Sequence, residues 1–208
     1  MCGRYVITNP VAKTKKIIKS AIKVDDIENY NAHPYQELPV IKRYTNGNTL
    51  EKLRWGIVPS WAKKKDFKPL INARLETIND KFSFKKLIKV TRCIVIADGF
   101  YEWKKGEKNK IPYYLFRKDK KLIYMAAIYS NNQFCIITEE AKNNVIEIHS
   151  RQPVILNENN INSYLNLELE ASDFLRQAKK PELKFHEISK DVNKPTNNNI
   201  SLIQIVNN

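Results

Sequence analysis

Between residues 92 and 138 the sequence contains five short apolar stretches, at 92–97, 100–105, 111–117, 122–128 and 133–138. Turn-forming pairs such as Lys105-Gly106 and Asn131-Asn132 separate them, so neighbouring stretches are joined by connections of hairpin length. Such short connections require antiparallel neighbours, because a parallel pair needs a crossover of about a dozen residues or more. The pattern therefore predicts an antiparallel β-sheet at the centre of the chain.

The flanking segments add two strands and a few helices to this sheet. Strands are predicted at 39–44 and 49–58, around the turn pair Asn46-Gly47, and a closing strand at 202–206. Apolar periodicity predicts helices at 11–23, 80–89, 139–144, 157–167 and 171–178, with Asn9, Asn157 and Ser172 as candidate caps. Residues 30–39 and 190–201 are expected to be loops. Strands outnumber helices, which predicts an α+β fold.

The length of 208 residues suits one domain, and the sequence contains no repeat or linker, so we expect a single domain over residues 1–208. No apolar run approaches the ~18 residues needed to span a bilayer, and no apolar stretch follows a basic start as in a secretory signal. We therefore expect a cytoplasmic protein that has no contact with the membrane.

The cysteines and histidines show no pattern of metal ligation. The three cysteines are far apart, at 2, 93 and 135, and none belongs to a C-x-x-C pair. The three histidines, His33, His149 and His186, lack the spacing of metal ligands. Cys93 and Cys135 lie within apolar runs and are expected in the core, and His186 is expected on a strand. We predict neither a metal site nor a cofactor.

Charge gives a first indication of the partner. The chain has 36 basic and 22 acidic residues, a formal net charge of +14. Such a balance favours a polyanion, with nucleic acid as the first candidate. The alternative is a solvated lysine surface on a chain rich in Lys, Asn and Ile. Charge alone leaves both interpretations open.

The chain starts with Met1-Cys2-Gly3-Arg4. A small second residue favours removal of the initiator methionine, which leaves Cys2 at the N-terminus. One Cα then carries an amine with a pKa near ~8 and a thiol with a pKa near ~8.5. Such an aminothiol attacks an aldehyde through nitrogen and then closes through sulfur to a thiazolidine ring. Alternatively, Cys2 is a chance residue in a poorly ordered terminus.

Four internal segments combine residues that can carry chemistry. Trp55 and Trp61 flank Gly56 and Pro59, either as a platform for unpaired bases or as a cap on the core. In the segment 71–77, Asn72 can donate and accept hydrogen bonds and Arg74 can bind a phosphate.

The other two segments carry titratable groups. Glu102 lies between two aromatic residues at the end of an apolar strand, where burial raises a carboxyl pKa toward the range of acid–base catalysis. His149 lies between two apolar strings, beside Arg151 and Pro153. Each has a structural alternative: Glu102 on the polar face of a strand, and His149 as a packing residue.

The motifs occur in a fixed order. After Met-Cys-Gly-Arg come Tyr30-Asn-Ala-His-Pro34, Arg54-Trp-Gly56 with Pro59-Ser-Trp61, Asn72-Ala-Arg74 with Glu76-Thr77, Ala97-Asp-Gly-Phe-Tyr-Glu-Trp103 and His149-x-Arg151-x-Pro153. In this order the chain resembles the SOS-response-associated peptidase (SRAP) family of abasic-site processing proteins, from residue 2 to residues 202–203. The resemblance implies a barrel-like, mostly antiparallel sheet with peripheral helices, a basic groove for single-stranded DNA, and covalent capture of abasic sites.

The resemblance also implies roles for individual residues. Cys2 is expected to form the thiazolidine, Asn72 to hold the sugar or the amine, Glu102 to act as acid and base, and His149 to assist proton transfer. The residues implied in contacts with DNA are Arg4, Pro34, Trp61, Arg74, Trp103, Thr138 and Arg151. A monomer that associates with the nucleoid through DNA is expected, with N-terminal self-processing and strand cleavage as side activities.

Three other functions are compatible with parts of the pattern. A class II glutamine amidotransferase also begins Met-Cys-Gly, but it needs a glutamine pocket and a synthase domain that we do not find. A thiol protease pairing Cys2 with His149 leaves Glu102 without a role. A non-catalytic single-strand binder uses the aromatic and basic residues and leaves Cys2 without a role.

Overall fold

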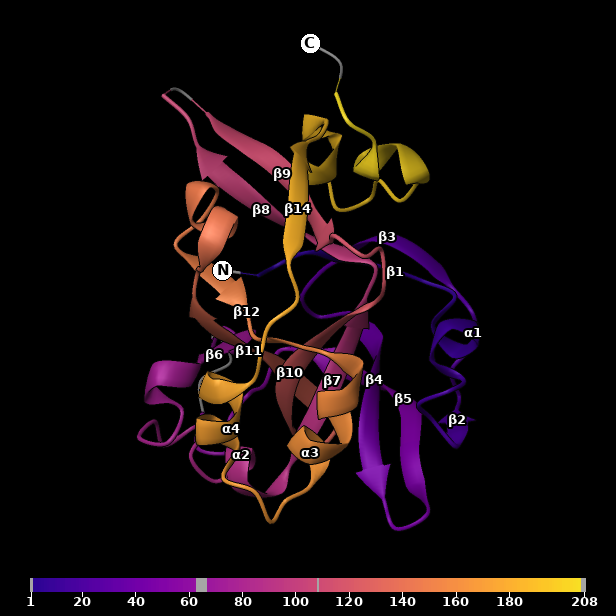
Figure 1. Cartoon of the computed structure of the whole chain (residues 1–208), viewed down its shortest axis with the longest axis vertical. Coiled ribbons are helices and arrows are strands. Elements are labelled where there is room, and N and C mark those ends of the chain that lie inside the picture. The colour runs from indigo at the N-terminus through magenta and orange to yellow at the C-terminus, as the bar shows by residue number, and fades with distance from the viewer. Residues whose placement is uncertain (1, 63–66, 108, 207–208) are drawn as a thin grey trace.

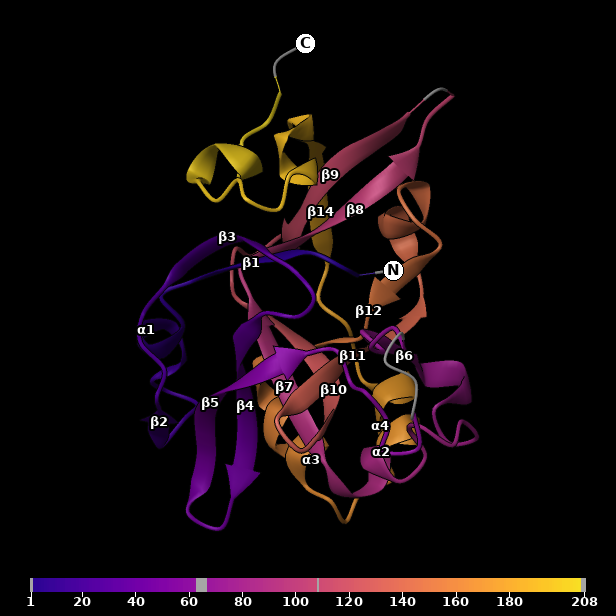
Figure 2. The same cartoon turned by 180° about the vertical axis from the view of Figure 1, so that it is seen from behind.

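Two β-sheets, one of five strands and one of nine, form the frame of the protein (Figures 1 and 2). The structure is a computed structural model, and residues 2–62, 67–107 and 109–206 are described. Strands dominate over short helices, and most strand pairs are antiparallel, which confirms the predicted α+β class.

The nine-stranded sheet is curved into a barrel. Its strands are β2 (Ser20–Ile22), β4 (Glu37–Tyr44), β5 (Gly47–Trp55), β6 (Asn72–Arg74), β7 (Arg92–Ala97), β10 (Ile123–Ser130), β11 (Gln133–Glu140), β12 (Arg151–Pro153) and β13 (Ile155–Leu156). Five of them are hydrogen-bonded in the order β11-β10-β7-β4-β5, and a parallel pairing between β5 and β11 closes this path on itself. Closure removes the exposed edges that an open sheet leaves unpaired. Trp55 and Phe134 are fully buried in the core and stack with their ring centroids 6.0 Å apart.

The five-stranded sheet is entirely antiparallel and lies above the barrel in Figure 1. Its strands are β1 (Tyr5–Thr8), β3 (Glu28–Ala32), β8 (Gly99–Lys105), β9 (Lys110–Arg117) and β14 (Leu183–Glu187), in the order β14-β9-β8-β1-β3. This sheet brings the start of the chain beside β8, because Tyr5 of β1 pairs with Phe100.

The passage from β7 to β8 joins the barrel to this second sheet. Only Asp98 separates the two strands, and its carboxylate accepts hydrogen bonds from the backbone N–H and the hydroxyl of Thr8 at 2.7 and 2.9 Å. Gly99 follows, where a Cβ atom would lie 2.4 Å from the Tyr114 ring on β9. This close approach requires glycine and sets β8 against β9, three residues before Glu102.

The helices are short and peripheral. They are α1 (Pro10–Thr14), α2 (Leu87–Val90), α3 (Ile161–Leu165) and α4 (Ala171–Gln177), with 3-10 turns at Leu75–Thr77, Asn143–Glu147, Glu158–Asn160, Lys190–Asn193 and Ile200–Ile203. Figure 1 shows α3 and α4 in front of the barrel strands, and Figure 2 shows them behind. Within the described residues, no helix has the length and apolar character needed to cross a membrane.

Three of the predicted helices are wrong in whole or in large part. The helix expected at 11–23 ends at Thr14, and residues 20–22 form β2 through a parallel pairing with β5. The helix expected at 80–89 is confined to its last turn in α2. The helix expected at 139–144 is absent because β11 continues to Glu140, which pairs with Arg151 of β12. In each case tertiary pairing or packing outweighs local propensity.

The predicted loops and caps also differ in part. Residues 28–32 form β3 within the expected loop, and the expected tail contains two 3-10 turns. The last strand is reduced to a single bridge between Ile205 and Ile188. Asn9 precedes α1 but makes no side-chain cap bond, nor does Asn157 before its 3-10 turn, and α4 is capped by Glu170, which accepts from the N–H of Ser172. The burial of Cys93 and Cys135 and the strand position of His186 are confirmed.

Candidate functional site

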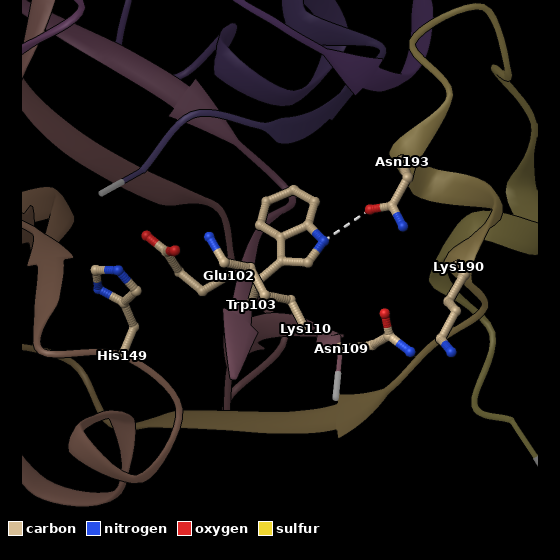
Figure 3. A pocket seen from close by; sticks show the side chains of 7 residues that line it. All are labelled: Glu102, Trp103, Asn109, Lys110, His149, Lys190 and Asn193. Carbon is tan, nitrogen blue, oxygen red and sulfur yellow. Dashed lines mark hydrogen bonds between the residues drawn. The ribbon is translucent and has the colours of Figure 1, made fainter. Parts of the chain in front are cut away.

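A cleft of about 710 Å³ opens between the β8–β9 hairpin, the segment before β12 and the 3-10 turn Lys190–Asn193 (Figure 3). Its lining residues are polar, basic or aromatic: Glu102, Trp103, Asn109, Lys110, His149, Lys190 and Asn193. In Figure 3 the Glu102 carboxylate lies between the His149 ring and the amine of Lys110. The cleft thus combines a carboxylate, an imidazole and cations around one space.

Glu102 is a buried acid at the edge of this cleft, with 2% of its surface exposed. Burial raises the pKa of its carboxyl to about 7, although the positive charges of the N-terminus and of Lys110 act in the opposite direction. A carboxyl with this pKa is present in both protonation states at neutral pH. It can therefore donate a proton in one step and accept one in the next.

His149 lies just before β12, and its ring is neutral at pH 7 because burial lowers its pKa below the ordinary value. The backbone N–H of Arg151 donates to its Nδ1 atom at 2.9 Å. The Arg151 carbonyl oxygen lies 3.2 Å from the same Nδ1 atom, and the shorter contact with the N–H favours the neutral tautomer that carries its proton on Nε2. His149 is thus oriented as a proton donor through Nε2.

Cys2 lies three residues before the start of β1 and is fully buried. Burial raises the pKa of its thiol well above the ordinary value, and the negative charge of Glu102 raises it further. Because Glu102 lines the cleft, its electrostatic interaction with the thiol connects Cys2 to this site. At neutral pH the sulfur is a protonated thiol, so it needs a proton acceptor before or during any attack.

Asn72 begins β6, where its backbone pairs with Ile136 of β11. Both polar atoms of its side-chain amide are buried, and neither has a hydrogen-bond partner within the described part of the chain. A buried amide left unpaired costs about 1–3 kcal/mol of stability. Such a group is typical of a site that completes its hydrogen bonds with a ligand.

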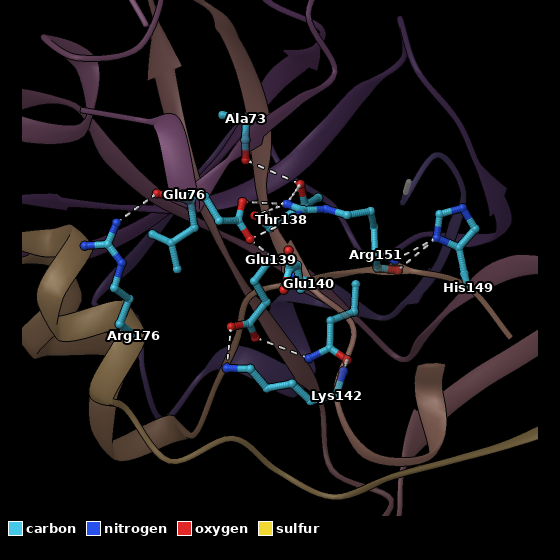
Figure 4. Close-up of polar contacts among 11 residues, drawn as sticks. Ala73, Glu76, Thr138, Glu139, Glu140, Lys142, His149, Arg151 and Arg176 are labelled. Carbon is cyan, nitrogen blue, oxygen red and sulfur yellow. Dashed lines mark hydrogen bonds and ion pairs between the residues drawn. The ribbon is translucent and has the colours of Figure 1, made fainter. Parts of the chain in front are cut away.

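Arg151 and Thr138 belong to one polar network on β11 and β12 (Figure 4). The Arg151 guanidinium donates to both carboxylate oxygens of Glu76 at 2.9 Å and to the Thr138 carbonyl, also at 2.9 Å. Burial raises the pKa of Glu76, but the hydrogen bonds and charge of Arg151, together with bonds from the backbone N–H groups of Glu76 and Glu140, outweigh it, and the net pKa lies below its ordinary value. Protein groups therefore hold Arg151 in one orientation.

Arg4 and Trp103 are held by the C-terminal segment. One Arg4 nitrogen donates to the Asn31 side-chain oxygen at 2.6 Å and to the Val192 carbonyl at 2.8 Å. The indole N–H of Trp103 donates to the Asn193 side-chain oxygen at 2.8 Å. The 3-10 turn 190–193 thus fixes the far wall of the cleft.

The lining of this cleft includes none of the other predicted residues, namely Cys2, Arg4, Pro34, Trp61, Asn72, Arg74, Thr138 and Arg151. Arg74 is exposed on β6 and is in register with Thr138. Pro34 lies in the turn between β3 and β4. Trp61 is 49% exposed and contacts Phe67 edge-on, with centroids 5.6 Å apart. Glu102, His149 and Trp103 thus line one cleft, the buried Cys2 thiol is electrostatically coupled to Glu102, and Trp61 belongs to another surface.

Four residues of the cleft were not predicted: Asn109, Lys110, Lys190 and Asn193. The pairing of β14 with β9 and the bridge between Ile188 and Ile205 bring the C-terminal turn to this site. No local motif predicts this packing. Two of the four residues are lysines, as the high lysine content of the chain would favour. Within the described residues, no group of three His, Cys, Asp or Glu side chains is arranged to hold a metal ion.

Comparison with known sequences now identifies the family. The family model described as "SOS response associated peptidase (SRAP)" matches residues 1–195. The chain belongs to the SRAP family. The abasic site processing protein YoqW of Bacillus subtilis is a relative at 34% identity, with 98% of this chain and 99% of YoqW covered. The abasic site processing protein YedK of Escherichia coli is 31% identical, with 99% and 100% covered.

Solved structures agree on the SRAP fold. A crystal structure of a protein from Bacteroides thetaiotaomicron superposes with a TM-score of 0.84, covering 99% of this chain and all of that one. Its sequence identity is 24%, so this likeness concerns the fold alone. The SRAP architecture of a closed barrel with an attached antiparallel sheet is therefore shared by both proteins.

Proposed function

We propose that this SRAP protein captures abasic sites in single-stranded DNA covalently, through Cys2 as the N-terminal residue. The observation that carries the proposal is the buried Glu102, with a pKa of about 7, in one cleft with His149 and electrostatically coupled to the Cys2 thiol. Relatives that the chain matches over nearly their full length are named abasic site processing proteins. Met1, whose removal the proposal requires, lies outside the described residues.

The first step opens the sugar. An abasic deoxyribose exists mostly as a closed hemiacetal, and its aldehyde is exposed when the ring oxygen gains a proton and the hydroxyl loses one. Glu102 can exchange both protons because both of its forms are populated near pH 7. The unpartnered amide of Asn72 is available to hold the opened sugar or the Cys2 amine.

The second step joins the protein to the sugar. The Cys2 amine adds to the aldehyde carbon, and loss of the resulting hydroxyl as water gives a Schiff base. The hydroxyl needs a proton to leave, and the Nε2–H of His149 or the protonated Glu102 can supply it. The nitrogen reacts first because the sulfur is still a neutral thiol at this pH.

The third step closes the thiazolidine. The Cys2 sulfur adds to the carbon of the C=N bond, the bonding pair moves to nitrogen, and the thiol proton passes to that nitrogen, directly or through the Glu102 carboxylate. Burial of Cys2 excludes water from the crosslink and shields the lesion. If the Schiff base loses its C2 proton instead, β-elimination cleaves the strand, which is the proposed lyase side activity. N-terminal processing that exposes Cys2 is the peptidase activity that we propose.

The electrostatics argue against a thiol protease. A Cys–His protease needs a thiolate next to an imidazolium, with a lowered thiol pKa. Here burial raises the pKa of Cys2 and lowers that of His149, so both groups are neutral at pH 7. A single-strand binder without covalent chemistry is the remaining alternative, supported by the net charge of +14.

A denaturing gel tests the proposal. Protein whose N-terminal residue is Cys2 is incubated with a single-stranded oligonucleotide containing one abasic site, and with the same strand intact. We expect a shifted band with the abasic strand only. Equal retention of both strands under native conditions, without a band on the denaturing gel, favours the non-catalytic binder.

Replacing Asn72 with leucine is expected to separate stability from activity. Leucine removes a buried amide that has no partner, so the free energy of unfolding should stay constant or rise by about 1 kcal/mol. Crosslinking should fall, because the variant has no amide to hold the opened sugar or the Cys2 amine. Asn31→Leu is the matched control: the Asn31 amide bonds Arg4 and three backbone carbonyls, and its loss should destabilise by about 1–3 kcal/mol. Urea unfolding and the gel assay check both outcomes. A large loss of stability in Asn72→Leu would contradict the interpretation of Asn72 as an unpaired buried amide.

A further inference from the structure

A second concave surface shares no lining residue with the cleft of Glu102 and His149, which we call the Cys2 cleft because Cys2 is proposed to react there. It is a groove of about 510 Å³ between the loop after β5, the segment before α2 and the turn from β10 to β11. We call it the Phe82 groove, and its principal residues are Trp61, Phe82, Lys85, Lys86, Val90 and Asn131. The proposed chemistry at Cys2 uses none of them, and only Trp61 is among the DNA contacts that the family resemblance implies.

The Phe82 groove exposes large apolar side chains to solvent. Phe82 is 72% exposed, Trp61 49% and Val90 48%. These side chains line one groove, and exposed apolar side chains gathered in one place, unlike ones scattered singly, are typical of a binding surface.

Cations accompany these rings. Lys85 and Lys86 line the groove, and the Lys85 amine lies 5.7 Å from the centroid of the Phe82 ring. None of the described lining residues is an aspartate or a glutamate. The groove is therefore apolar and aromatic at its surface and positive in charge, which fits a partner with flat π-faces and negative charges.

We propose that the Phe82 groove binds one arm of the same single strand that is captured at Cys2, with a base stacked on Phe82 and phosphates at Lys85 and Lys86. Exposed aromatic rings with interspersed lysines are the features by which proteins bind unpaired strands irrespective of sequence. A double helix keeps the faces of its bases stacked and cannot offer them to Phe82. The proposal rests on the proposed function, because the strand must also cross the Cys2 cleft.

The barrel sets the distance between the two surfaces. Asn131 lies in the groove, in the turn two residues before β11, and Ile136 of β11 pairs with Asn72 of the candidate site. The five residue steps from Asn131 to Ile136 span at most ~17 Å at ~3.4 Å per residue. Stacked nucleotides are also spaced by ~3.4 Å, so an arm of about five nucleotides is needed to reach the groove.

The test compares arm lengths. The single strands are either intact or carry one abasic site at the central position. On either side of that position they have arms of about two or about ten nucleotides, which are shorter or longer than the ~17 Å span. The triple variant Phe82→Ala/Lys85→Ala/Lys86→Ala is compared with wild type. Ile22→Ala/Lys15→Ala/Lys16→Ala is the matched control, since it removes one exposed apolar side chain and two charges from the α1–β2 region.

For long strands, we expect the groove variant to bind at least about tenfold more weakly, because stacking of one base contributes about 1–3 kcal/mol. The slope of log affinity against log salt should decrease by about 1.4, for two lost phosphate contacts on a single strand. Binding of strands with two short arms, and the rate at which they crosslink, should be unchanged. The control variant should lose far less affinity for long strands.

Two results would overturn the proposal: equal affinity of the groove variant and wild type for long strands, or an equal loss for long and short strands. If wild-type protein forms no crosslink with abasic strands, the proposed covalent capture fails. The dependence of intact-strand affinity on arm length still decides whether the groove binds DNA. Stronger binding of long duplex than of long single strands also contradicts a stacking surface.

Discussion

Replacing Cys2 with alanine is expected to abolish the stable crosslink with an abasic strand, a loss limited only by the sensitivity of the gel. The variant retains an N-terminal amine after methionine removal but has no sulfur to close the ring. Its affinity for intact single strands should change less than about twofold, because Cys2 is fully buried and makes no phosphate contact. Alanine is smaller by one sulfur atom, so thermal unfolding must show that the variant is folded.

The proposed order of steps predicts what this variant does instead. Without the thiol the reaction stops at the Schiff base, so a reducing agent such as borohydride should trap a covalent band with Cys2→Ala. Strand cleavage should increase, because the Schiff base persists long enough for β-elimination. A stable band without reduction would refute the role of sulfur.

An N-terminal extension provides the complementary control. A chain with extra residues before Cys2 keeps the thiol but has no free amine on that residue. It should give no band with or without borohydride, and normal crosslinking by such a chain would refute attack through nitrogen. The two variants together assign the two bonds of the proposed ring to nitrogen and sulfur separately.

The strands could be predicted from sequence because their alternation and turn pairs are local properties. Observed β7 and β11 start at the predicted residues, and β8, β9 and β10 start within one residue of them. The barrel closure could not be derived in this way, because the parallel pairing of β5 with β11 joins residues far apart in the chain. The helix predicted at 11–23 failed for a related reason: residues 20–22 gain hydrogen bonds from β5 that a local pattern does not encode.

The candidate site was predictable to the extent that its residues lie in ordered motifs. Glu102 and His149 fall in such motifs, and the structure places both in one cleft. Lys190 and Asn193 were missed because the C-terminal segment reaches the cleft through the sheet pairing of β14. Lys110 begins β9 and belongs to none of the ordered motifs. Phe82 was missed as well, since an aromatic residue in a segment predicted as helix is normally part of the core.

The second large effect is expected for Glu102→Gln. Glutamine has the shape of glutamate but cannot exchange a proton, so the crosslinking rate at pH 7 should fall by about 10²–10⁴-fold. The wild-type rate should change most near pH 7, where the Glu102 carboxyl titrates, and the variant should lack that feature. Single-turnover crosslinking across pH measures both effects, and a pH profile unchanged in Glu102→Gln would exclude this carboxyl as the titrating group.

The same substitution should stabilise the fold, and the sign follows from proton binding. The pKa of Glu102 is about 7 in the folded state, compared with an ordinary value of 4.5. Between these values the folded protein holds a proton that the unfolded chain releases, so the contribution of Glu102 to wild-type stability is greatest below pH 4.5 and falls as pH rises through about 7. The total loss is about 3 kcal/mol.

Glutamine stays neutral throughout this range and avoids the cost of a buried negative charge. The two proteins should therefore be equally stable below pH 4.5, and Glu102→Gln should be more stable by about 3 kcal/mol above pH 8. Urea unfolding at several pH values measures the difference. If the variant is both inactive and more stable, the burial of Glu102 supports the reaction and lowers the stability of the fold. A variant that is less stable than wild type at high pH would refute the buried-acid interpretation.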